Sequence, residues 1–446
     1  MVFSSFQFLF QFLPVFLLIY FISPKSLKNP VIFLGSLIFY YYGVIDHPWY
    51  VLLMLLAVVI NYVMALCMDK ASGTGARRFC LILGLTYNIG VLAAFKYLKI
   101  AALPVGISFY TFQISSYLID VYWKKFPAEK SLITLGTYLC LFPQLIAGPI
   151  VTYAQVRTQL HRRVHSYTNL ENGLRFFTIG LALKVLIANR IGGLWTQVAT
   201  IGYESISTPL AWMGLFAFTF QIYFDFYGYS LMAKGLGQIM GFSFPKNFSN
   251  PYLARSMTDF WRRWHMTLGS WFREYVYIPL GGNRRHLYRN LLIVWFLTGM
   301  WHGAGWNFIL WGLTLCGLIC LEKSGLGKFL ENHAFFGHLY MLFVIPLSWL
   351  LFAVNDFSKI LLYLQRLFPF FGQAGGTVFA GDYLKYGKQY GIVFLAAILF
   401  CSMLPEKIYR KYHHTFLATL TLVILFWACV YCMYLGMDDP FLYYQF

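Results

Sequence analysis

Long apolar runs separated by short basic loops extend over the whole chain. A helix needs about 20 predominantly apolar residues to cross the hydrocarbon core of a bilayer. Pro or Gly interrupts several of the runs, which is typical of broken or re-entrant helices. We expect about 11 transmembrane helices plus re-entrant or interfacial helices. The expected segments are Phe6–Ile22, Pro30–Ile45, Trp49–Cys67, Phe79–Phe95, Val105–Trp123, Leu132–Tyr153, Phe176–Ile191, Leu210–Tyr227, Leu291–Leu321, His338–Val354, Gly391–Leu404 and Phe416–Leu435.

The runs are continuous, so they lack the alternation of period two that marks the strands of a membrane β-barrel. We therefore predict an all-α polytopic membrane protein. The first segment, MVFSSFQFLFQFLPVFLLIYF, has no basic region and no small-residue cleavage site. It is interpreted as a retained span rather than a signal peptide. The apolar excess continues to the end of the chain, and we expect a single membrane domain over residues 1–446.

Composition and charge agree with this interpretation. Apolar residues make up 59% of the chain and charged residues 11%, whereas a soluble domain has about 45–50% and about 25%. The net charge is +18, which indicates basic cytosolic loops and contact with anionic membrane lipid, since no nucleic-acid-binding motif is present. The loops that contain Lys25, Lys70 and Lys124 are basic, whereas the loop Asp46–Pro48 is not. This pattern places the N-terminus outside and the cluster Arg255–Arg289 in the cytosol.

The usual catalytic motifs are missing. The eight cysteines lie mostly in apolar segments. Cys429 and Cys432 have the spacing of a redox or metal motif, but small buried side chains explain them better. The sequence contains no GxSxG elbow, no Walker A loop and no HExxH motif, so it does not indicate a serine hydrolase, an ATPase or a zinc protease. We expect no metal site and no bound cofactor.

His302 lies inside the apolar run LTGMWHGAGWNFILWG. An ionisable side chain in a membrane is costly, and imidazole transfers protons near neutral pH. If the span begins at Leu291, His302 lies about 15 Å along it, near the middle of a core about 30 Å thick. The glycines Gly299, Gly303 and Gly305 allow a kink and close approach by another helix. We interpret His302 as a candidate catalytic base, or as a residue that accepts the acyl group transiently; the alternative is a histidine that only hydrogen-bonds between helices.

The stretch Asp259–Arg285 combines an aromatic stripe with arginines. The stripe recurs at helical spacing and consists of Phe260, Trp264, Leu268, Trp271 and Tyr275. Asp259 and Arg263 are four residues apart and can form an ion pair. An amphipathic helix at the membrane interface would explain the pattern. Alternatively, Arg262, Arg263 and Arg273 bind the phosphates of an anionic donor.

Asp225 lies in a second apolar run, FTFQIYFDFYGYS. A buried carboxylate needs a partner, and Lys184, Arg255 or a histidine are the candidates. We interpret Asp225 as one half of a structural ion pair, with a direct role beside the substrate as the alternative.

Together these stretches resemble the membrane-bound O-acyltransferases, and among them the bacterial alginate O-acetyltransferase-like subgroup. The resemblance covers nearly the whole chain, and its last two internal blocks are the most specific. The stretches that carry it are MVFSSFQFLFQFLPVF at the start, LPVGISFYTFQISSYLIDVY at 103–122, LFPQLIAGPIVTY at 141–153, IYFDFYGYS at 222–230, DFWRRWHMTLGSWFREYVYIPLGGNR at 259–284, TGMWHGAGWNFILWG at 298–312 and the ending PFLYYQF.

The resemblance implies a central tunnel, with peripheral helices over residues 1–100, a core with the tunnel over 101–330, and C-terminal helices over 331–446. It also implies His302 as the catalytic histidine and His265 as a second catalytic residue towards the cytosol. We hypothesise that Trp301, Trp306 and Asn307 shape the pocket and hold the imidazole.

The resemblance further implies that acetyl-CoA in the cytosol is the acyl donor. The acetyl group then crosses the bacterial inner membrane for O-acetylation of an exported or cell-surface polysaccharide, which is alginate-like, cellulose-like or peptidoglycan. A separate exported acetyltransferase of the SGNH type commonly completes the reaction in this subgroup, and we expect such a partner here.

The chain departs from the subgroup at FDFYGYSLMA, where FDFSGYSDMA is common. Tyr227 and Leu231 replace the serine and the aspartate, so the polysaccharide is left open. The stretch IPLGGNR favours acetylation over D-alanine transfer from a carrier protein to teichoic acid, which stays an alternative. A non-catalytic subunit for polysaccharide export is another. A transporter or flippase is disfavoured, since neither inverted repeats nor a series of intramembrane charges is visible.

Overall fold

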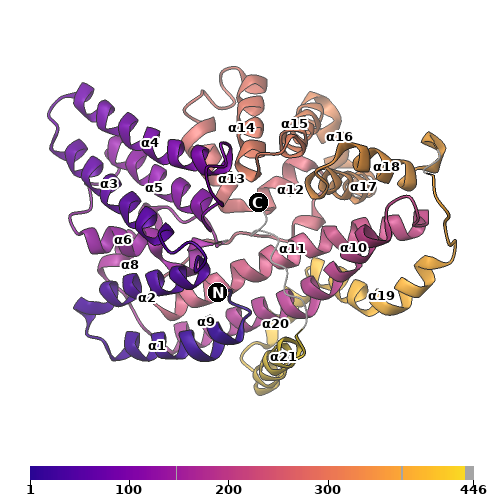
Figure 1. The fold of residues 1–446 in the computed structure, drawn as a ribbon, viewed down its shortest axis with the longest axis horizontal. Helices are drawn as coiled ribbons and strands as arrows, with labels where there is room; N and C mark the ends of the chain where they lie inside the picture. The colour runs from indigo at the N-terminus through magenta and orange to yellow at the C-terminus, as the bar shows by residue number, and fades with distance from the viewer. Residues whose placement is uncertain (147, 373–374, 437–446) are drawn as a thin grey trace. The chain divides into compact units, whose positions relative to one another are not determined.

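A computed structural model describes residues 1–146, 148–372 and 375–436. Every regular element in this part of the chain is a helix, which confirms the predicted all-α architecture (Figure 1). The chain divides into two compact units, Met1–Leu181 with Tyr229–Lys246, and Ala182–Gly228 with Asn247–Phe446. The single domain with peripheral, core and C-terminal helices stays a prediction. Two parts of the resemblance, Ala147 and the ending PFLYYQF, lie outside the described residues.

The first unit begins with a π-helical turn, Gln7–Phe12, that continues into α1. α9 ends one residue beyond this unit, and the long helix α11 (Thr208–Ile239) enters it at Tyr229. The other helices are α1 (Leu13–Ile22), α2 (Lys28–Gly43), α3 (Tyr50–Lys70), α4 (Thr74–Lys96), α5 (Ile107–Tyr122), α6 (Leu132–Cys140), α7 (Phe142–Leu145), α8 (Tyr153–His161) and α9 (Tyr167–Ala182).

Helices α3, α4 and α5 run side by side in this unit (Figure 1). Asn61 on α3 and Asn88 on α4 are both buried, and their amides exchange two hydrogen bonds of 2.8 Å. Such an exchange satisfies polar groups that would otherwise be costly between apolar helices. A Cβ at Gly84 would lie 2.5 Å from the side chain of Leu118, so the glycine lets α4 and α5 approach closely.

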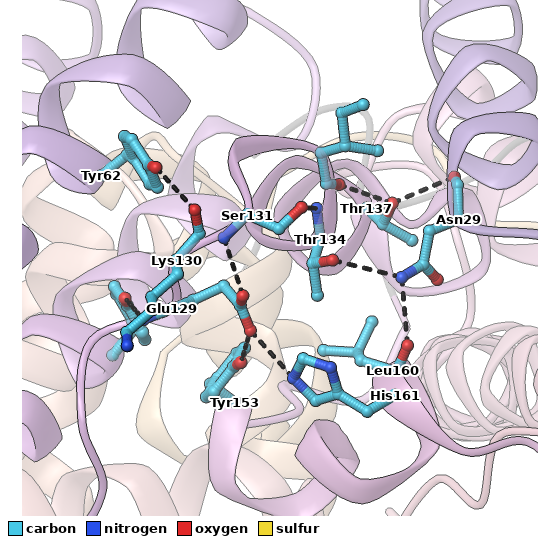
Figure 2. A network of polar contacts seen from close by, with 12 residues as sticks. Asn29, Tyr62, Glu129, Lys130, Ser131, Thr134, Thr137, Tyr153, Leu160 and His161 are labelled. Carbon is cyan, nitrogen blue, oxygen red and sulfur yellow. Dashed lines mark hydrogen bonds and ion pairs between the residues drawn. The ribbon is translucent and has the colours of Figure 1, made fainter. Parts of the chain in front are cut away.

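A polar network holds the loop before α6 in the same unit (Figure 2). The carboxylate of Glu129 accepts hydrogen bonds from the backbone N–H of Ser131 and the hydroxyl of Tyr153. It also lies 2.9 Å from Nε2 of His161, at the end of α8. Glu129 is buried and His161 is half exposed. A buried carboxylate needs several donors, so the network ties this loop to α8.

The second unit begins with the π-helical turn Leu183–Ala188 and contains the N-terminal part of α11. Its other helices are α10 (Asn189–Ile201), α12 (Met257–Arg263), α13 (Met266–Phe272), α14 (Leu287–His302), α15 (Trp306–Leu321), α16 (Gly327–Asn332), α17 (Ala334–Ala353), α18 (Phe357–Leu367), α19 (Asp382–Cys401), α20 (Leu404–Tyr412) and α21 (Phe416–Tyr434).

Seven helices in the described part of the chain are long and apolar enough to cross a membrane. The count of about 11 is not confirmed, because several expected segments are broken. The segment Leu132–Tyr153 is divided among α6, α7 and the start of α8, and Leu291–Leu321 turns after His302. The seven helices are Tyr50–Lys70, Thr74–Lys96, Tyr167–Ile201, Trp306–Asn332, Ala334–Ala353, Asp382–Cys401 and Phe416–Tyr434.

Candidate functional site

The apolar run that contains His302 folds as a helical hairpin in the second unit. α14 ends at His302 and α15 follows after a short turn, in the part of the run where the glycines allow a kink. A Cβ at Gly299 would lie 2.5 Å from the carbonyl oxygen of Phe308, and a Cβ at Gly312 would lie 2.5 Å from that of Trp295. Only glycine permits this backbone approach. The two glycines therefore set the position of His302.

Three aromatic rings surround the buried imidazole of His302, and we call Trp301, Trp311 and Phe352 the aromatic cage. Their centroids lie 4.8, 5.0 and 5.2 Å from that of the imidazole, at interplanar angles of 78°, 87° and 80°. Edge-to-face contacts of this kind are favourable and directional. His302 is 5% exposed, so the cage both orients the imidazole and limits the access of bulk water.

The block Asp259–Arg285 is not the single interfacial helix that its periodicity predicts. α12 ends at Arg263 and α13 begins at Met266, because His265 adopts the left-handed conformation, with φ 42° and ψ 52°. This break is stabilised from outside the block, where Asn247 accepts a backbone hydrogen bond from Met266. The predicted single helix is therefore wrong. The stripe residues are nevertheless buried, so they form core rather than a membrane-surface face.

His265 lies at this break and is 2% exposed. Its ring is perpendicular to that of Phe226 at 4.6 Å and lies 6.1 Å from that of Trp301. Nδ1 lies 3.1 Å from Oδ1 of Asn247. Nε2 has no hydrogen-bond partner among the described residues. Burial lowers the pKa of His265 to about 3, so the imidazole is neutral at physiological pH. The ring of Trp301 thus lies next to both candidate histidines, His265 and His302.

The three predicted phosphate-binding arginines lie around this break. Arg263 Nε donates to Oδ1 of Asp259 at 2.9 Å, which confirms the predicted pair. Arg262 and Arg273 are exposed. The N-terminus of α12 is held by the buried carboxylate of Glu322, which accepts hydrogen bonds from the backbone N–H groups of residues 257 and 258. Arg262 and Arg263 are thus on an anchored helix, whereas Arg273 follows α13. The role of the three arginines in binding a donor stays a prediction.

Asp225 forms an ion pair with Lys184, one of its three candidate partners. Nζ of Lys184 lies 2.8 Å from Oδ1 of Asp225 and donates to Oδ1 of Asn189 at 2.7 Å. Both charged side chains are almost completely buried. The pair joins the π-helical turn Leu183–Ala188 to α11, so a structural role is the one that the contacts support.

The two residues predicted on the far side of the turn behave differently. Asn307 is 1% exposed, and its Nδ2 donates to the carbonyl oxygens of Leu351 and Phe352 at 3.3 and 3.5 Å. It thereby positions the segment that supplies a wall of the aromatic cage. Trp306 is 73% exposed and is not one of the rings around His302.

Sequence reasoning missed three residues of the site. Trp311 lies inside the block that resembles the family, but nothing in its spacing singles it out. Phe352 comes from α17, about fifty residues away along the chain, and carries no local signal. Asn247 lies in the loop before α12, where an isolated asparagine looks like an ordinary turn residue. Only the fold brings these side chains to the two histidines.

The two grooves described for this structure do not include His302 or His265. One of about 370 Å³ lies in the second unit beside Phe220 and Pro346, and one of about 500 Å³ lies in the first unit beside Phe16 and Gly35. Neither is lined by a candidate histidine. Among the described residues, no three His, Cys, Asp or Glu side chains come together as metal ligands. The tunnel to His302 stays a prediction.

Comparison with known proteins identifies the family. The profile of the membrane-bound O-acyltransferase family matches residues 37–338. The chain belongs to this family. This membership and the apolar helices confirm the prediction of a multi-pass membrane protein, and they agree with the bacterial inner membrane as its location.

Three relatives carry more specific names. The "Probable alginate O-acetylase AlgI" of Pseudomonas aeruginosa is 40% identical over 337 residues, 70% of this chain and 64% of that protein. The "Peptidoglycan O-acetyltransferase" of Helicobacter pylori is 37% identical over 368 residues, 70% of this chain and 68% of that protein. The "Teichoic acid D-alanyltransferase" of Bacillus subtilis is 28% identical over 223 residues, 47% of this chain and 56% of that protein. The match to the Pseudomonas protein thus spans less than two thirds of its length.

Proposed function

We propose that this protein is an O-acetyltransferase that takes an acetyl group from cytosolic acetyl-CoA for the O-acetylation of an exported or cell-surface polysaccharide. The observation that carries the proposal is the buried imidazole of His302, held by its aromatic cage at the end of α14 in a chain of the acyltransferase family. The names of the Pseudomonas and Helicobacter relatives support acetyl as the group and a polysaccharide as the acceptor. The D-alanyl relative matches less of the chain at lower identity.

In the proposed reaction, an acceptor hydroxyl approaches the thioester carbonyl of acetyl-CoA beside His302. The hydroxyl oxygen forms the new C–O bond, the C–S bond breaks, and His302 passes the hydroxyl proton to the departing CoA thiolate. The aromatic cage keeps bulk water away from the thioester, which suppresses its hydrolysis. Arg262 and Arg273 are exposed on the preceding block and would bind the CoA phosphates.

An exported acetyltransferase of the SGNH type would be the partner that completes polysaccharide O-acetylation. The neighbouring genes distinguish acetyl transfer from D-alanyl transfer. Acetyl transfer predicts a gene for such an exported acetyltransferase beside the gene of this protein. A carrier-protein ligase in that place would favour D-alanyl transfer instead.

The test uses the full chain in proteoliposomes with radiolabelled acetyl-CoA outside and, inside, an acceptor polysaccharide together with the exported SGNH-type acetyltransferase. We expect transfer by the wild type and a loss of about 10²–10⁴-fold in His302→Ala. His333→Ala is the matched control, because His333 is exposed at the start of α17, and it should keep full activity. Undiminished transfer by a folded His302→Ala protein would contradict the proposal.

A further inference from the structure

The side chain of Asn247 is the acceptor for three donors at the break between α12 and α13. Its Oδ1 lies 3.1 Å from Nδ1 of His265, 3.3 Å from the backbone N of Thr267 and 2.8 Å from Oγ1 of Thr267. Asn247 and His265 are both buried, at 4% and 2% exposure. Hydrogen bonds in such a dry place are strong and costly to leave unmade.

The backbone donor at residue 267 decides which atom of the Asn247 amide faces the histidine. A backbone N–H can only donate, so the amide atom that it contacts is the oxygen and not the nitrogen. A carboxamide oxygen can only accept. Nδ1 of His265 must therefore carry a hydrogen, because its contact with that oxygen would otherwise join two acceptors. The assignment needs no assumption about the histidine itself.

The second ring nitrogen then follows from the charge of the ring. Burial keeps His265 neutral, since its pKa is lowered to about 3. A neutral imidazole with its hydrogen on Nδ1 carries a lone pair on Nε2. Besides Asn247, the aromatic rings of Phe226 on α11 and Trp301 on α14 lie against the imidazole, and none of the three side chains is charged. Asp225, which precedes Phe226, is paired with Lys184.

We propose that Asn247 is a positioning residue that fixes the Nδ1–H tautomer of His265 and so presents Nε2 as a hydrogen-bond acceptor beside Trp301. The role in turnover rests on the proposed acetyl transfer. During acetyl transfer, Nε2 of His265 accepts a hydrogen bond from the hydroxyl group that receives the acetyl group, and so orients the hydroxyl oxygen. His302, which also neighbours Trp301, takes the hydroxyl proton. The tautomer itself does not depend on any activity.

The first test measures the tautomer directly. Protein labelled with ¹⁵N in its 10 histidines is reconstituted in nanodiscs, and the signals of His265 are assigned as those lost in His265→Gln. We expect a protonated, pyrrole-type Nδ1 and an unprotonated, pyridine-type Nε2 at pH 7. The opposite pattern, or a mixture of both tautomers, would overturn the proposal.

The second test changes the acceptor atom. Asn247→Asp keeps an oxygen at Nδ1–H and adds a negative charge, which stabilises the imidazolium; we expect the acid limb of the pH–rate profile to move to higher pH. Asn247→Leu removes the acceptor and should lower the rate by about 10–1000-fold. Thr267→Val is the control, since it removes one of the other donors and leaves the His265 contact.

These outcomes separate the two proposals. An unmoved pH profile in Asn247→Asp, or equal losses in Asn247→Leu and Thr267→Val, would show that Asn247 is merely structural. Thermal unfolding of each variant checks that it folds. A fully active His302→Ala protein would instead contradict acetyl transfer through His302, while the nitrogen signals of His265 would still decide its tautomer.

Discussion

Nζ of Lys184 lies 2.8 Å from Oδ1 of Asp225, and the two side chains are 2% and 1% exposed. Both charges are therefore out of contact with water, and each depends on the other. Breaking a buried pair by removing one partner leaves an uncompensated charge, which costs about 3–5 kcal/mol.

We expect Asp225→Asn and Lys184→Met each to lower the free energy of unfolding by about 3–5 kcal/mol. The double variant should lose much less than the sum of the two, because no unpaired charge remains. Unfolding in detergent, followed by circular dichroism, measures the three values. Additive losses would mean that the two side chains do not interact energetically.

The buried His265 predicts a pH dependence of stability. The unfolded chain binds a proton at this residue below the ordinary pKa of 6.5, whereas burial keeps the folded pKa at about 3. Between these values the unfolded state holds more protons, so the free energy of unfolding falls as the pH falls, by up to about 1.4 kcal/mol per pH unit. Above pH 6.5 this contribution does not change.

His265→Gln should remove this part of the slope between pH 6.5 and pH 5, because glutamine does not titrate. His333→Gln, at an exposed histidine, should keep the wild-type slope. Melting temperatures across that range provide the comparison. Parallel curves for the wild type and His265→Gln would show that His265 binds its proton in the folded protein as well.

The close contact of α14 and α15 predicts a contrast between two glycines of one helix. A Cβ at Gly312 would lie 2.5 Å from the carbonyl oxygen of Trp295, whereas a Cβ at Gly317 meets no atom within 4 Å. Gly312→Ala should force the helices apart, cost about 1–3 kcal/mol and move His302. Gly317→Ala should be neutral or stabilising by up to about 1 kcal/mol, because alanine favours helix.

The melting temperature and the rate of acetyl transfer are measured for both variants. The geometry expects a loss of stability and of transfer in Gly312→Ala alone. If both variants have the same stability and the same transfer rate, the close contact of α14 and α15 at Gly312 does not control the position of His302.

Several features of the fold follow from local patterns in the sequence. Apolar length predicts the spans of α3, α4 and α21, and the excess length of Leu291–Leu321 together with its glycines predicts the turn after His302. The four-residue spacing predicts the Asp259–Arg263 pair. These are properties of short sequence windows, so no tertiary information is needed for them.

Other features depend on contacts between distant segments. The periodicity of Asp259–Arg285 predicts one helix, but hydrogen bonds between Asn247 and residues 265–267 hold the break at His265. The aromatic cage is completed by Phe352 on α17. Asn307 holds the segment of Phe352 through its bonds to the carbonyl oxygens of Leu351 and Phe352. Its predicted contact with the imidazole stays a prediction. Helical periodicity does not predict which distant loop or helix will contact a given turn.

Trp311 offers a test of whether the aromatic cage also takes part in binding. Its indole is fully buried, and Nε1 has no hydrogen-bond partner among the described residues. A buried donor without an acceptor costs about 1–3 kcal/mol, and its ring lies 5.0 Å from that of His302. We therefore expect a bound acyl carbonyl to accept this hydrogen bond.

Trp311→Phe keeps an aromatic ring against His302 and removes the N–H. We expect acetyl transfer to fall by about 100–1000-fold, as for the loss of one donor to a reacting carbonyl, with the melting temperature unchanged or higher. Trp306→Phe is the matched control, because that indole is 73% exposed, and it should leave transfer unchanged. Equal transfer by the wild type and Trp311→Phe would mean that this N–H is not used by the substrate, and the cage would then act on His302 only through packing.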